Sequence, residues 1–183
     1  MIKNIIVRSK NGESVKAKFI ELNLSHIDNI IELQNEVVDA LENKELYFPS
    51  EKEEFENIIN NTGKIIGCIT ESNELISIGV YCKLGLNKEN YGYDIDLSEE
   101  ELFNVGQIEC TIVKPLYRGN KLQYITCEIL EKIGKENNTN IIMATASPDN
   151  FYSVNTFKKL GYDIVKEKLK YGGLKRYILK KNI

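Results

Sequence analysis

The segment of residues 105–130 joins a strand-like apolar run to a polar turn, a combination that could bind a phosphate group. The apolar run is rich in β-branched residues and ends at Pro115. Residues 118–121 (Arg-Gly-Asn-Lys) separate it from apolar residues at helical spacing, namely Leu122, Ile125, Ile129, Leu130 and Ile133. A helix that starts directly after such a turn presents unpaired N–H groups and the positive end of its dipole. The turn is therefore a candidate anion site.

The strand expected at residues 106–113 offers two side chains for acid–base chemistry. Alternation along a strand places Gln107 and Glu109 on one face and Cys110 on the other. A partly buried Glu109 would have a raised pKa, which suits a general base near neutral pH. The alternative is a structural salt bridge or hydrogen bond made by Glu109, and the residues alone leave both readings open. His26 is the only histidine, so histidine-based catalysis and a multi-histidine metal site are not expected.

Composition favours one soluble globular domain that spans residues 1–183. The chain has no apolar run near the ~20 residues of a membrane span, and it starts without the apolar core of a signal peptide. The four cysteines form no Cys-x-x-Cys pair, so we expect reduced, buried thiols and no metal site. These features favour a cytoplasmic protein that does not bind membranes.

Charge is distributed unevenly along the chain. Residues 151–183 contain nine Lys or Arg residues but only two acids, whereas residues 86–104 contain six acids and a single lysine. The basic end could bind an anionic ligand, or it could be the solvated face of a strand. Since no nucleic-acid-binding motif accompanies it, we expect no DNA or RNA partner.

Hydrophobic periodicity and turn residues divide the chain into strands and helices. A hairpin is expected around Asn11-Gly12, a helix at residues 26–41 after a cap at Ser25, and a second helix after a capping box that starts at Ser50. Ser98 could cap a short helix within residues 86–104. Further strands are expected at residues 64–70, 75–83, 106–113, 140–146, 162–169 and 176–181, and further helices at residues 122–136 and 151–160.

The order ββ-α-α-ββ-β-α-β-α-β-β indicates the α/β class with an α+β mixed sheet. The strands at residues 106–113 and 140–146 flank a helix, so they are expected to be parallel in a βαβ unit. The remaining strands follow one another through short turns, which favours a mostly antiparallel central sheet with helices on both faces. An exposed final strand could pair across a dimer, so both a monomer and a homodimer are compatible with the sequence.

Two blocks of sequence resemble the GNAT superfamily of acyl-CoA-dependent N-acyltransferases. Residues 113–123 (VKPLYRGNKLQ) are similar to the family's strand, proline, Tyr-Arg-Gly turn and helix start, which hold the CoA pyrophosphate. Residues 148–162 (PDNFYSVNTFKKLGY) are similar to the block that lines the far side of the pantetheine and ends in Leu-Gly-aromatic. The resemblance covers nearly the whole chain and implies the GNAT acyl-CoA N-acyltransferase fold.

The resemblance also implies acetyl-CoA as the co-substrate, with no metal. In the family, the strand before the turn splays from its neighbour at a bulge, which frees backbone groups for the pantetheine and the acetyl carbonyl. By resemblance, Ile112 and Val113 would supply those groups. The other positions that correspond to the CoA-binding blocks are Arg118, Gly119, Asn120, Lys121, Leu122, Gln123, Asn150, Ser153 and Phe157.

The sequence departs from the family pattern at three positions. Lys121 and Gln123 stand where small residues are usual, and we expect pyrophosphate binding through the backbone to be retained. Phe157 stands where many relatives have a tyrosine that protonates the leaving thiolate, and a phenyl ring cannot donate a proton. The acid would then be Tyr152 or Tyr162, or water, or the reaction needs none.

The function that this resemblance implies is N-acetyl transfer from acetyl-CoA to a primary amine of a small molecule or peptide, in a direct ternary complex. Glu109, Gln107 and Tyr152 are the candidate catalytic residues. The acids of residues 86–104 and the turn at residues 171–173 are candidate walls of the acceptor site, and those acids would favour a cationic amine. The alternative function is a non-catalytic acyl-CoA-binding or regulatory module.

Overall fold

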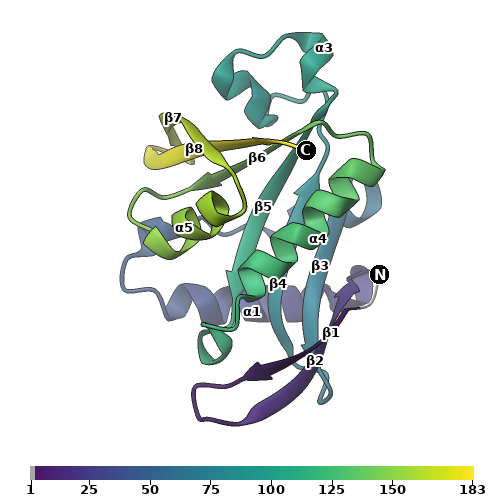
Figure 1. Ribbon diagram of the computed structural model, residues 1–183, viewed down its shortest axis with the longest axis vertical. Coiled ribbons are helices and arrows are strands. Elements are labelled where there is room, and N and C mark those ends of the chain that lie inside the picture. The colour runs from purple at the N-terminus through teal and green to yellow at the C-terminus, as the bar shows by residue number, and fades with distance from the viewer. Residues whose placement is uncertain (1–2) are drawn as a thin grey trace.

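The computed structural model describes residues 3–183 and contains one eight-stranded sheet (Figure 1). The strand order is β1-β2-β3-β4-β5-β6-β8-β7, and only β5 and β6 are parallel. The strands are β1 (Lys3–Arg8), β2 (Ser14–Glu21), β3 (Gly63–Thr70), β4 (Leu75–Cys82), β5 (Val105–Val113), β6 (Ile141–Ala146), β7 (Asp163–Lys170) and β8 (Leu174–Asn182). The expected mixed, mostly antiparallel sheet is therefore confirmed. The sheet ends at β7 and not at the final strand, so the expectation of an exposed final strand is wrong.

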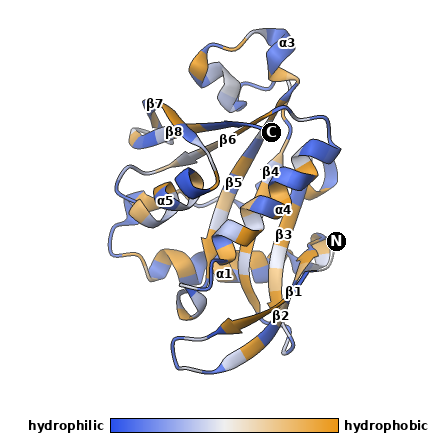
Figure 2. Ribbon diagram, in the orientation of Figure 1, coloured by the Kyte–Doolittle hydropathy of each residue, from blue (hydrophilic) through white to orange (hydrophobic). Residues whose placement is uncertain are grey.

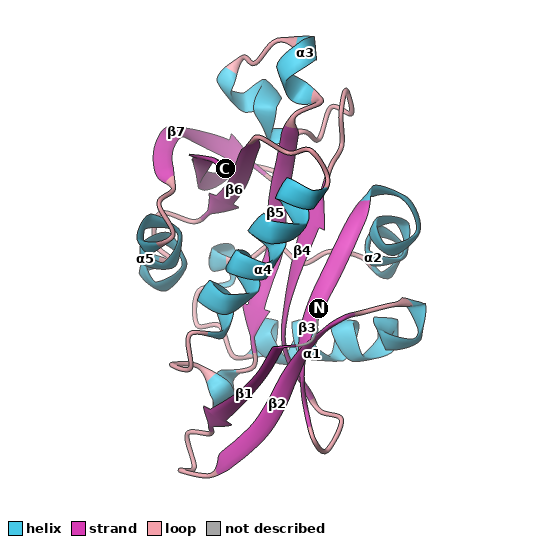
Figure 3. Cartoon of the chain, turned by 45° about the vertical axis from the view of Figure 1, so that its right-hand side comes forward, coloured by secondary structure: helices cyan, strands magenta, loops and turns pink. Residues whose placement is uncertain are grey.

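Helices cover both faces of this sheet (Figure 3). One face packs against α4 and α5, and the opposite face packs against α1 and α2. The α-helices are α1 (Ile27–Asp39), α2 (Lys52–Asn57), α3 (Glu99–Leu102), α4 (Leu122–Glu136) and α5 (Phe151–Lys159). Single turns of 3-10 helix are η1 (Leu24–His26), η2 (Lys44–Leu46), η4 (Tyr91–Ile95) and η5 (Pro115–Tyr117), and η3 (Ile58–Thr62) is a π-helical turn.

The core consists of two large apolar layers separated by the sheet. Figure 2 shows that the central strands are predominantly hydrophobic, as expected for strands that are covered on both faces. Phe19, Leu130 and Phe157 are fully buried on the side of α4 and α5, while Ile30 and Phe55 are buried on the side of α1 and α2. Because the middle of the sheet is buried on both sides, its position relative to the helices is well defined.

A β-bulge in β5 separates β5 from β6 and creates the central irregularity of the sheet. Pairing of β5 with β6 ends at Ile108, whereas pairing with β4 continues to Val113. The register against β4 shifts between Ile78 and Val80, and Cys110 lies in the left-handed region with φ of +41°. Figure 1 shows β5 and β6 diverging beyond this point. The half of β5 after the bulge therefore has one edge without a strand partner.

The bulge also overturns the expected alternation of side chains. Cys110 packs with the apolar layer of α1 and α2, on the same side as Val80, which pairs with Glu109. Ile108 packs on the α4 side, whereas Ile112 packs on the α1 side, although four residues would keep one face in a regular strand. The prediction that Cys110 faces away from Glu109 is therefore wrong, because one extra residue reverses the alternation.

Two expected helix caps are also misplaced by one or two residues. Asn23, and not Ser25, caps the first turn, since its side chain accepts from the Ser25 N–H. The helix after residue 50 begins with Glu51 as its cap, because the Ser50 backbone instead pairs with the Gln34 side chain. The capping box of Ser98 and Glu101 and the hairpin turn with Gly12 at φ of +90° are confirmed.

Helix α4 crosses the sheet at closest range over Gly79 of β4. A Cβ atom at Gly79 would lie 2.5 Å from Cγ2 of Thr126, and Thr126 is a β-branched residue with little rotamer freedom. The contact fixes the distance between α4 and the strand that pairs with the bulge. A larger residue at position 79 would lift the helix away from the sheet.

We expect Gly79→Ala to lower the free energy of unfolding by about 1–3 kcal/mol, the usual cost of an overpacked core. Thr126→Ser removes the methyl group that the new Cβ would strike, so the double variant should recover at least ~0.5 kcal/mol relative to the sum of the two single effects. Urea denaturation of the four proteins in this cycle measures the coupling. Strictly additive effects would contradict the close approach.

Candidate active site

The turn before α4 presents a row of backbone N–H groups without acceptors. Gly119 has φ of +95° and Lys121, the N-cap of α4, has φ of +57°, so the backbone turns sharply into the helix. Within residues 3–183, the backbone N–H groups of residues 119–123 have no hydrogen-bond acceptor. Successive free N–H groups at the start of a 15-residue helix make an anion site. The residues present therefore fit a pyrophosphate group.

The side chains of Arg118 and Asn120 in this turn form hydrogen bonds to neighbouring backbone groups. The Asn120 amide donates to the carbonyl oxygens of Arg8 and Tyr117, both within 2.9 Å, and its oxygen accepts from the Arg8 N–H at 2.8 Å. These bonds tie the turn to β1. Arg118 is exposed and its Nε donates to the Val113 carbonyl oxygen at 3.4 Å. Leu122 is buried under the helix, and Lys121 points a free ammonium group to solvent.

Gln123 links the two sides of the opening between β5 and β6. Its amide donates to Oγ1 of Thr111, in the bulged half of β5, and to Oγ of Ser153 in α5, each at 3.0 Å. Asn150 caps α5 by accepting from the Ser153 N–H at 3.2 Å. Position 123 is usually a small residue in the family, and the glutamine found here instead forms a hydrogen-bonded bridge between β5 and α5. Thr111, Gln123, Asn150 and Ser153 come together although they lie on three elements.

Beside this bridge, β5 presents an unpaired strand edge. Ile112 and Val113 pair with β4 on one side, and no strand of the described residues pairs with them on the other. An unpaired edge can accept an extended ligand through main-chain hydrogen bonds, as in strand addition. The amide-rich arm of pantetheine has this chemistry. Both residues named from the sequence are therefore positioned on the free edge.

Glu109 lies at the bulge with its carboxylate on the α1 side of the sheet. Its side chain accepts from the Gln107 amide, and Sγ of Cys82 lies 3.9 Å from Oε2. No cation forms an ion pair with Glu109 among the described residues, so the hydrogen-bond alternative is present and the salt-bridge alternative is not. Burial raises the pKa of Glu109, with hydrogen bonds from Gln107 and Cys82 acting in the opposite direction. A carboxylate in this state is a suitable proton acceptor.

Gln107 is fully buried and orients Glu109. Its oxygen accepts from the Tyr91 N–H at 3.0 Å, and its amide donates to the Glu89 carbonyl oxygen at 3.3 Å as well as to Glu109. Gln107 therefore attaches the segment of residues 86–104 to β5. It acts on the carboxylate of Glu109 and holds the main chain next to it.

Cys110 belongs to a second buried network that positions the loop between α1 and α2. The Tyr47 hydroxyl donates to Oε1 of Gln34 at 2.8 Å and also lies 2.8 Å from Sγ of Cys110. Gln34 in turn holds both backbone groups of Ser50. Burial raises the pKa of the Cys110 thiol to about 12, so it is protonated near neutral pH. The loop that carries residues 47 and 48 is thus fixed against the bulge.

Three aromatic rings from distant parts of the chain meet near Glu109, and we refer to Phe48, Tyr91 and Tyr171 as the aromatic cluster. Phe48 stacks on Tyr171 with centroids 5.0 Å apart. The Tyr171 hydroxyl lies 2.9 Å from that of Tyr91 and 3.1 Å from Oγ1 of Thr145. The charge of Glu109 contributes to the raised pKa values of both tyrosines, after burial as the main cause. The cluster therefore lies within electrostatic reach of the proposed base.

The turn at residues 171–173, which the sequence suggested as a wall of the acceptor site, places Tyr171 in the aromatic cluster. Tyr171 has φ of +52°, and the next two glycines also have positive φ values. A non-glycine residue in the left-handed region is strained, and such strain often marks a functional position. Here it directs the ring toward Phe48 and Tyr91. The sequence did not single out Phe48, Tyr91, Thr145 or the buried Arg176 behind Tyr171.

Three of the six acids of residues 86–104, namely Asp94, Asp96 and Glu101, have partners within the described part of the chain. Asp94 is buried between Lys168 and Lys170 of β7, with the Lys168 ammonium 2.7 Å away, and Asp96 lies 3.7 Å from Lys166. Desolvation opposes ionisation of Asp94, but the two lysines hold its pKa below the usual value. The acidic segment and the basic end of the chain therefore bind each other. This pairing weakens the case for a cationic acceptor.

Tyr152 and Phe157 lie on α5 but face opposite ways. The Tyr152 side chain is 89% exposed, and the structure does not bring it together with Gln107 and Glu109. Phe157 is buried and contacts Tyr162 edge to face at 5.0 Å, as an ordinary core aromatic would. Tyr162 is buried as well, with its pKa raised by burial. The Tyr162 hydroxyl is therefore not exposed for proton exchange with solvent, and Phe157 has no proton to donate.

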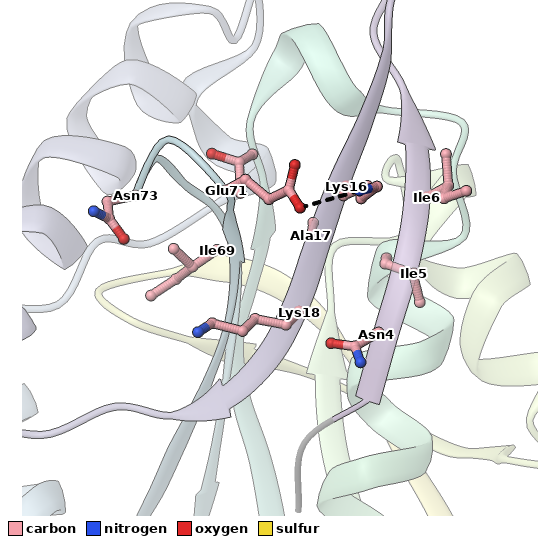
Figure 4. Close-up of a pocket in the computed structure, with 10 residues that line it drawn as sticks. Asn4, Ile5, Ile6, Lys16, Ala17, Lys18, Ile69, Glu71 and Asn73 are labelled. Carbon is pink, nitrogen blue, oxygen red and sulfur yellow. Dashed lines mark ion pairs between the residues drawn. The ribbon is translucent and has the colours of Figure 1, made fainter.

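A surface hollow lies elsewhere, beside β1, β2 and the end of β3 (Figure 4). It has a volume of about 790 Å³, and the ion pair of Lys16 and Glu71 at 3.5 Å spans part of its wall. None of its lining residues belongs to β5, α4 or α5. Among the described residues, no helix has the length and apolar character to cross a membrane, and no cluster of three or more metal-ligand side chains occurs.

Comparison with known proteins connects this geometry to a family. The sequence model of the acetyltransferase (GNAT) family matches residues 25–162, whereas no curated protein matches the chain in sequence. A putative acetyltransferase from Acinetobacter baylyi is 18% identical, with a TM-score of 0.69 over 91% of this chain and 92% of that one. The ribosomal-protein-S18-alanine N-acetyltransferase from Escherichia coli is 10% identical, with a TM-score of 0.68 over 91% and 94%. A putative acetyltransferase from Salmonella typhimurium, solved with its cofactor acetyl-CoA, is 11% identical, with a TM-score of 0.67 over 91% and 93%.

At these identities the solved structures establish the fold, and the expected GNAT fold is confirmed. The family match includes α1, the bulged strand β5, the turn before α4 and the whole of α5. It covers well over half of the chain. The protein therefore belongs to the GNAT family of acetyltransferases.

Proposed function

We propose that the protein transfers the acetyl group of acetyl-CoA to a primary amine of a small molecule or peptide, in a direct ternary complex. The observation that carries this proposal is the bulge at Cys110, which gives β5 a free edge between the partly buried carboxylate of Glu109 and the turn with free N–H groups. A cytoplasmic location, where acetyl-CoA and reduced thiols occur together, is part of the same proposal.

Acetyl-CoA would supply an activated thioester, and the residues of this chain would bind and orient it. The N–H groups of residues 119–123 would hold the pyrophosphate, with Arg118 and Lys121 adding positive charge. The free edge at Ile112 and Val113 would receive the pantetheine amides and polarise the acetyl carbonyl. Gln123 would exchange its bonds to Thr111 and Ser153 for contacts with the ligand.

Glu109 would accept a proton from the acceptor ammonium or amine, directly or through one water molecule. The amine nitrogen then attacks the carbonyl carbon, the carbon–sulfur bond breaks, and the sulfur leaves with its electron pair. Gln107 holds the carboxylate during this step. Tyr152, which is exposed, or solvent would protonate the thiolate. The neutral thiol of Cys110 is a poor nucleophile, which favours direct transfer over an acyl-enzyme.

The direct test is CoA-thiol release from acetyl-CoA with a panel of amines. Release that depends on the amine, together with an acetylated product detected by mass spectrometry, would establish the transfer. Tight CoA binding with no release across a broad panel would instead favour a non-catalytic acyl-CoA-binding or regulatory module. Gel filtration of the same sample decides between a monomer and a homodimer.

Glu109→Gln should lower kcat by about 10²–10⁴-fold, the usual contribution of a general base, and leave CoA affinity unchanged. The variant should be at least as stable as the wild type at neutral pH, because it removes a buried carboxylate that has no cationic partner. Glu128→Gln, an exposed neutral substitution on α4, is the matched control. A less stable but active Glu109→Gln protein would assign Glu109 a structural role.

The raised pKa of Glu109 predicts how kcat/KM and the free energy of unfolding depend on pH. We expect wild-type kcat/KM to rise with pH through a limb above the ordinary glutamate value of ~4.3, because the base must be ionised. Stability should fall over the same interval, since the folded state keeps the proton to higher pH than the unfolded state does. Both dependences should be missing in Glu109→Gln, as measured by pH–rate profiles and thermal unfolding.

Lys121→Gly should raise the free energy of unfolding by roughly 1 kcal/mol, because glycine adopts φ of +57° without strain. If the backbone N–H groups bind the pyrophosphate, the affinity for CoA should stay the same or increase. Lys121→Ala is the control, since it removes the same charge and keeps the strain. Isothermal titration with CoA measures both variants, and an equal loss of affinity in both would mean that the ammonium group binds the phosphate.

A further inference from the structure

Arg176 of β8 is a buried cation that forms no ion pair with an acid among the described residues. Its side chain is 4% exposed, and its Nη1 donates to the Lys175 carbonyl oxygen at 2.8 Å. Its Nη2 is buried and has no hydrogen-bond partner among residues 3–183. No carboxylate within that part of the chain forms an ion pair with it; Glu45 of η2 is the one acid whose charge acts on its pKa. A buried guanidinium without a partner is costly, so it is normally kept for a reason.

The position of Arg176 connects it to the proposed reaction. Its guanidinium carbon lies 5.6 Å from the ring centroid of Tyr171, the central ring of the aromatic cluster. Tyr171 is linked to Glu109 through Tyr91 and Gln107: the Tyr171 hydroxyl lies 2.9 Å from that of Tyr91, the Tyr91 N–H donates to Gln107, and the Gln107 amide donates to Glu109. Burial lowers the pKa of Arg176, but a guanidinium stays charged at neutral pH. The aromatic ring beside the cation is therefore connected to the proposed base by hydrogen bonds.

We propose that Arg176 binds an anionic oxygen group of the acceptor, which makes the acceptor an amine that also carries a carboxylate or a phosphate. The planar guanidinium matches either group through paired N–H donors. The amine end would reach Glu109, and the body of the acceptor would lie along Tyr171 and Tyr91. Phe48 is half exposed and stacks on Tyr171, so this outer ring must shift for the anion to reach Nη2.

The unequal use of charge in this region supports an anionic acceptor. The buried acid of the neighbouring segment, Asp94, already binds Lys168 and Lys170, so it has no free charge for a cationic ligand. Arg176, by contrast, has an unused donor. Because Asp94 has two lysines as partners and Arg176 has no carboxylate partner among residues 3–183, the missing charge is negative.

This inference rests on the proposed acetyl transfer. Pairs of acceptors that differ only in their anionic group test the role of Arg176 separately from the transfer itself. Thiol release from acetyl-CoA would be compared for the common L-amino acids and their carboxamides, and for phosphoethanolamine and ethanolamine. We expect the anionic member of the best pair to have roughly ten- to a hundredfold higher kcat/KM, the range for hydrogen bonds to a charged group. The amino-acid pairs and the phosphate pair distinguish a carboxylate from a phosphate.

Arg176→Met should reduce that preference to less than about twofold, and Arg176→Lys should retain part of it. Lys175→Met is the matched control, because it removes one positive charge from the exposed neighbouring residue. Unchanged CoA affinity and circular dichroism would show that Arg176→Met is folded. A preference that survives in Arg176→Met, or is absent from the wild type, would overturn the inference.

A second measurement needs no turnover. In the presence of CoA, N-acetylated amino acids should raise the melting temperature of the wild type and of Lys175→Met more than the corresponding N-acetyl amides do, and this difference should vanish in Arg176→Met. Acetyl transfer without a preference for anionic acceptors would reject the role of Arg176 and leave the proposed function standing. Arg176-dependent anion binding without thiol release would support the role of Arg176 in binding and reject the proposed acetyl transfer.

Discussion

The hydrogen bonding between β5 and β6 stops at Ile108, and the arrangement of the site follows from that interruption. A continuous ladder would have paired Ile112 and Val113 on both sides and left no edge for a ligand. The extra residue at Cys110 bends the strand and reverses the direction of the side chains that follow. As a result the carboxylate of Glu109, the thiol of Cys110 and the free edge occupy consecutive positions of one strand. The cost is one strained residue in the middle of the sheet.

Neighbouring elements keep the opening at a fixed width. On one side, the contact between Gly79 and Thr126 sets α4 against β4, so the free N–H groups at the helix start have a defined distance from β5. On the other side, the Gln123 bridge joins Thr111 to Ser153. Gln34 and Tyr47 fix the α1–α2 loop against Cys110 from the opposite face. The opening is therefore braced on both faces by hydrogen bonds and close packing, which suits a site that must orient two reactants.

The sequence predicted the order of elements and the turn that we propose binds CoA because those features are local. The βαβ unit, the Gly119 turn and the helix that follows the turn at residues 147–150 depend on residues within a few positions of each other. The bulge was not predictable from alternation, since that rule assumes a regular strand and therefore misplaced Cys110. The aromatic cluster was missed because Phe48, Tyr91 and Tyr171 lie far apart in the chain and meet only after the sheet forms. Arg176 could have been noticed, since alternation along β8 places it on the same face as the apolar Ile178.

The uneven charge of the chain also acquires a physical meaning in three dimensions. From the sequence we expected an acidic and a basic region that attract ligands of opposite sign. In the structure, Asp94 and Asp96 instead form ion pairs with the lysines of β7. This contact does more than cancel charge, because Lys170 also lies 4.8 Å above the ring of Tyr91. Asp94 thus holds the cation that supports Tyr91, and Tyr91 in turn supports Tyr171 through their hydroxyl groups. The charged residues of this region position the aromatic surface, and Nη2 of Arg176 behind that surface has no hydrogen-bond partner among residues 3–183.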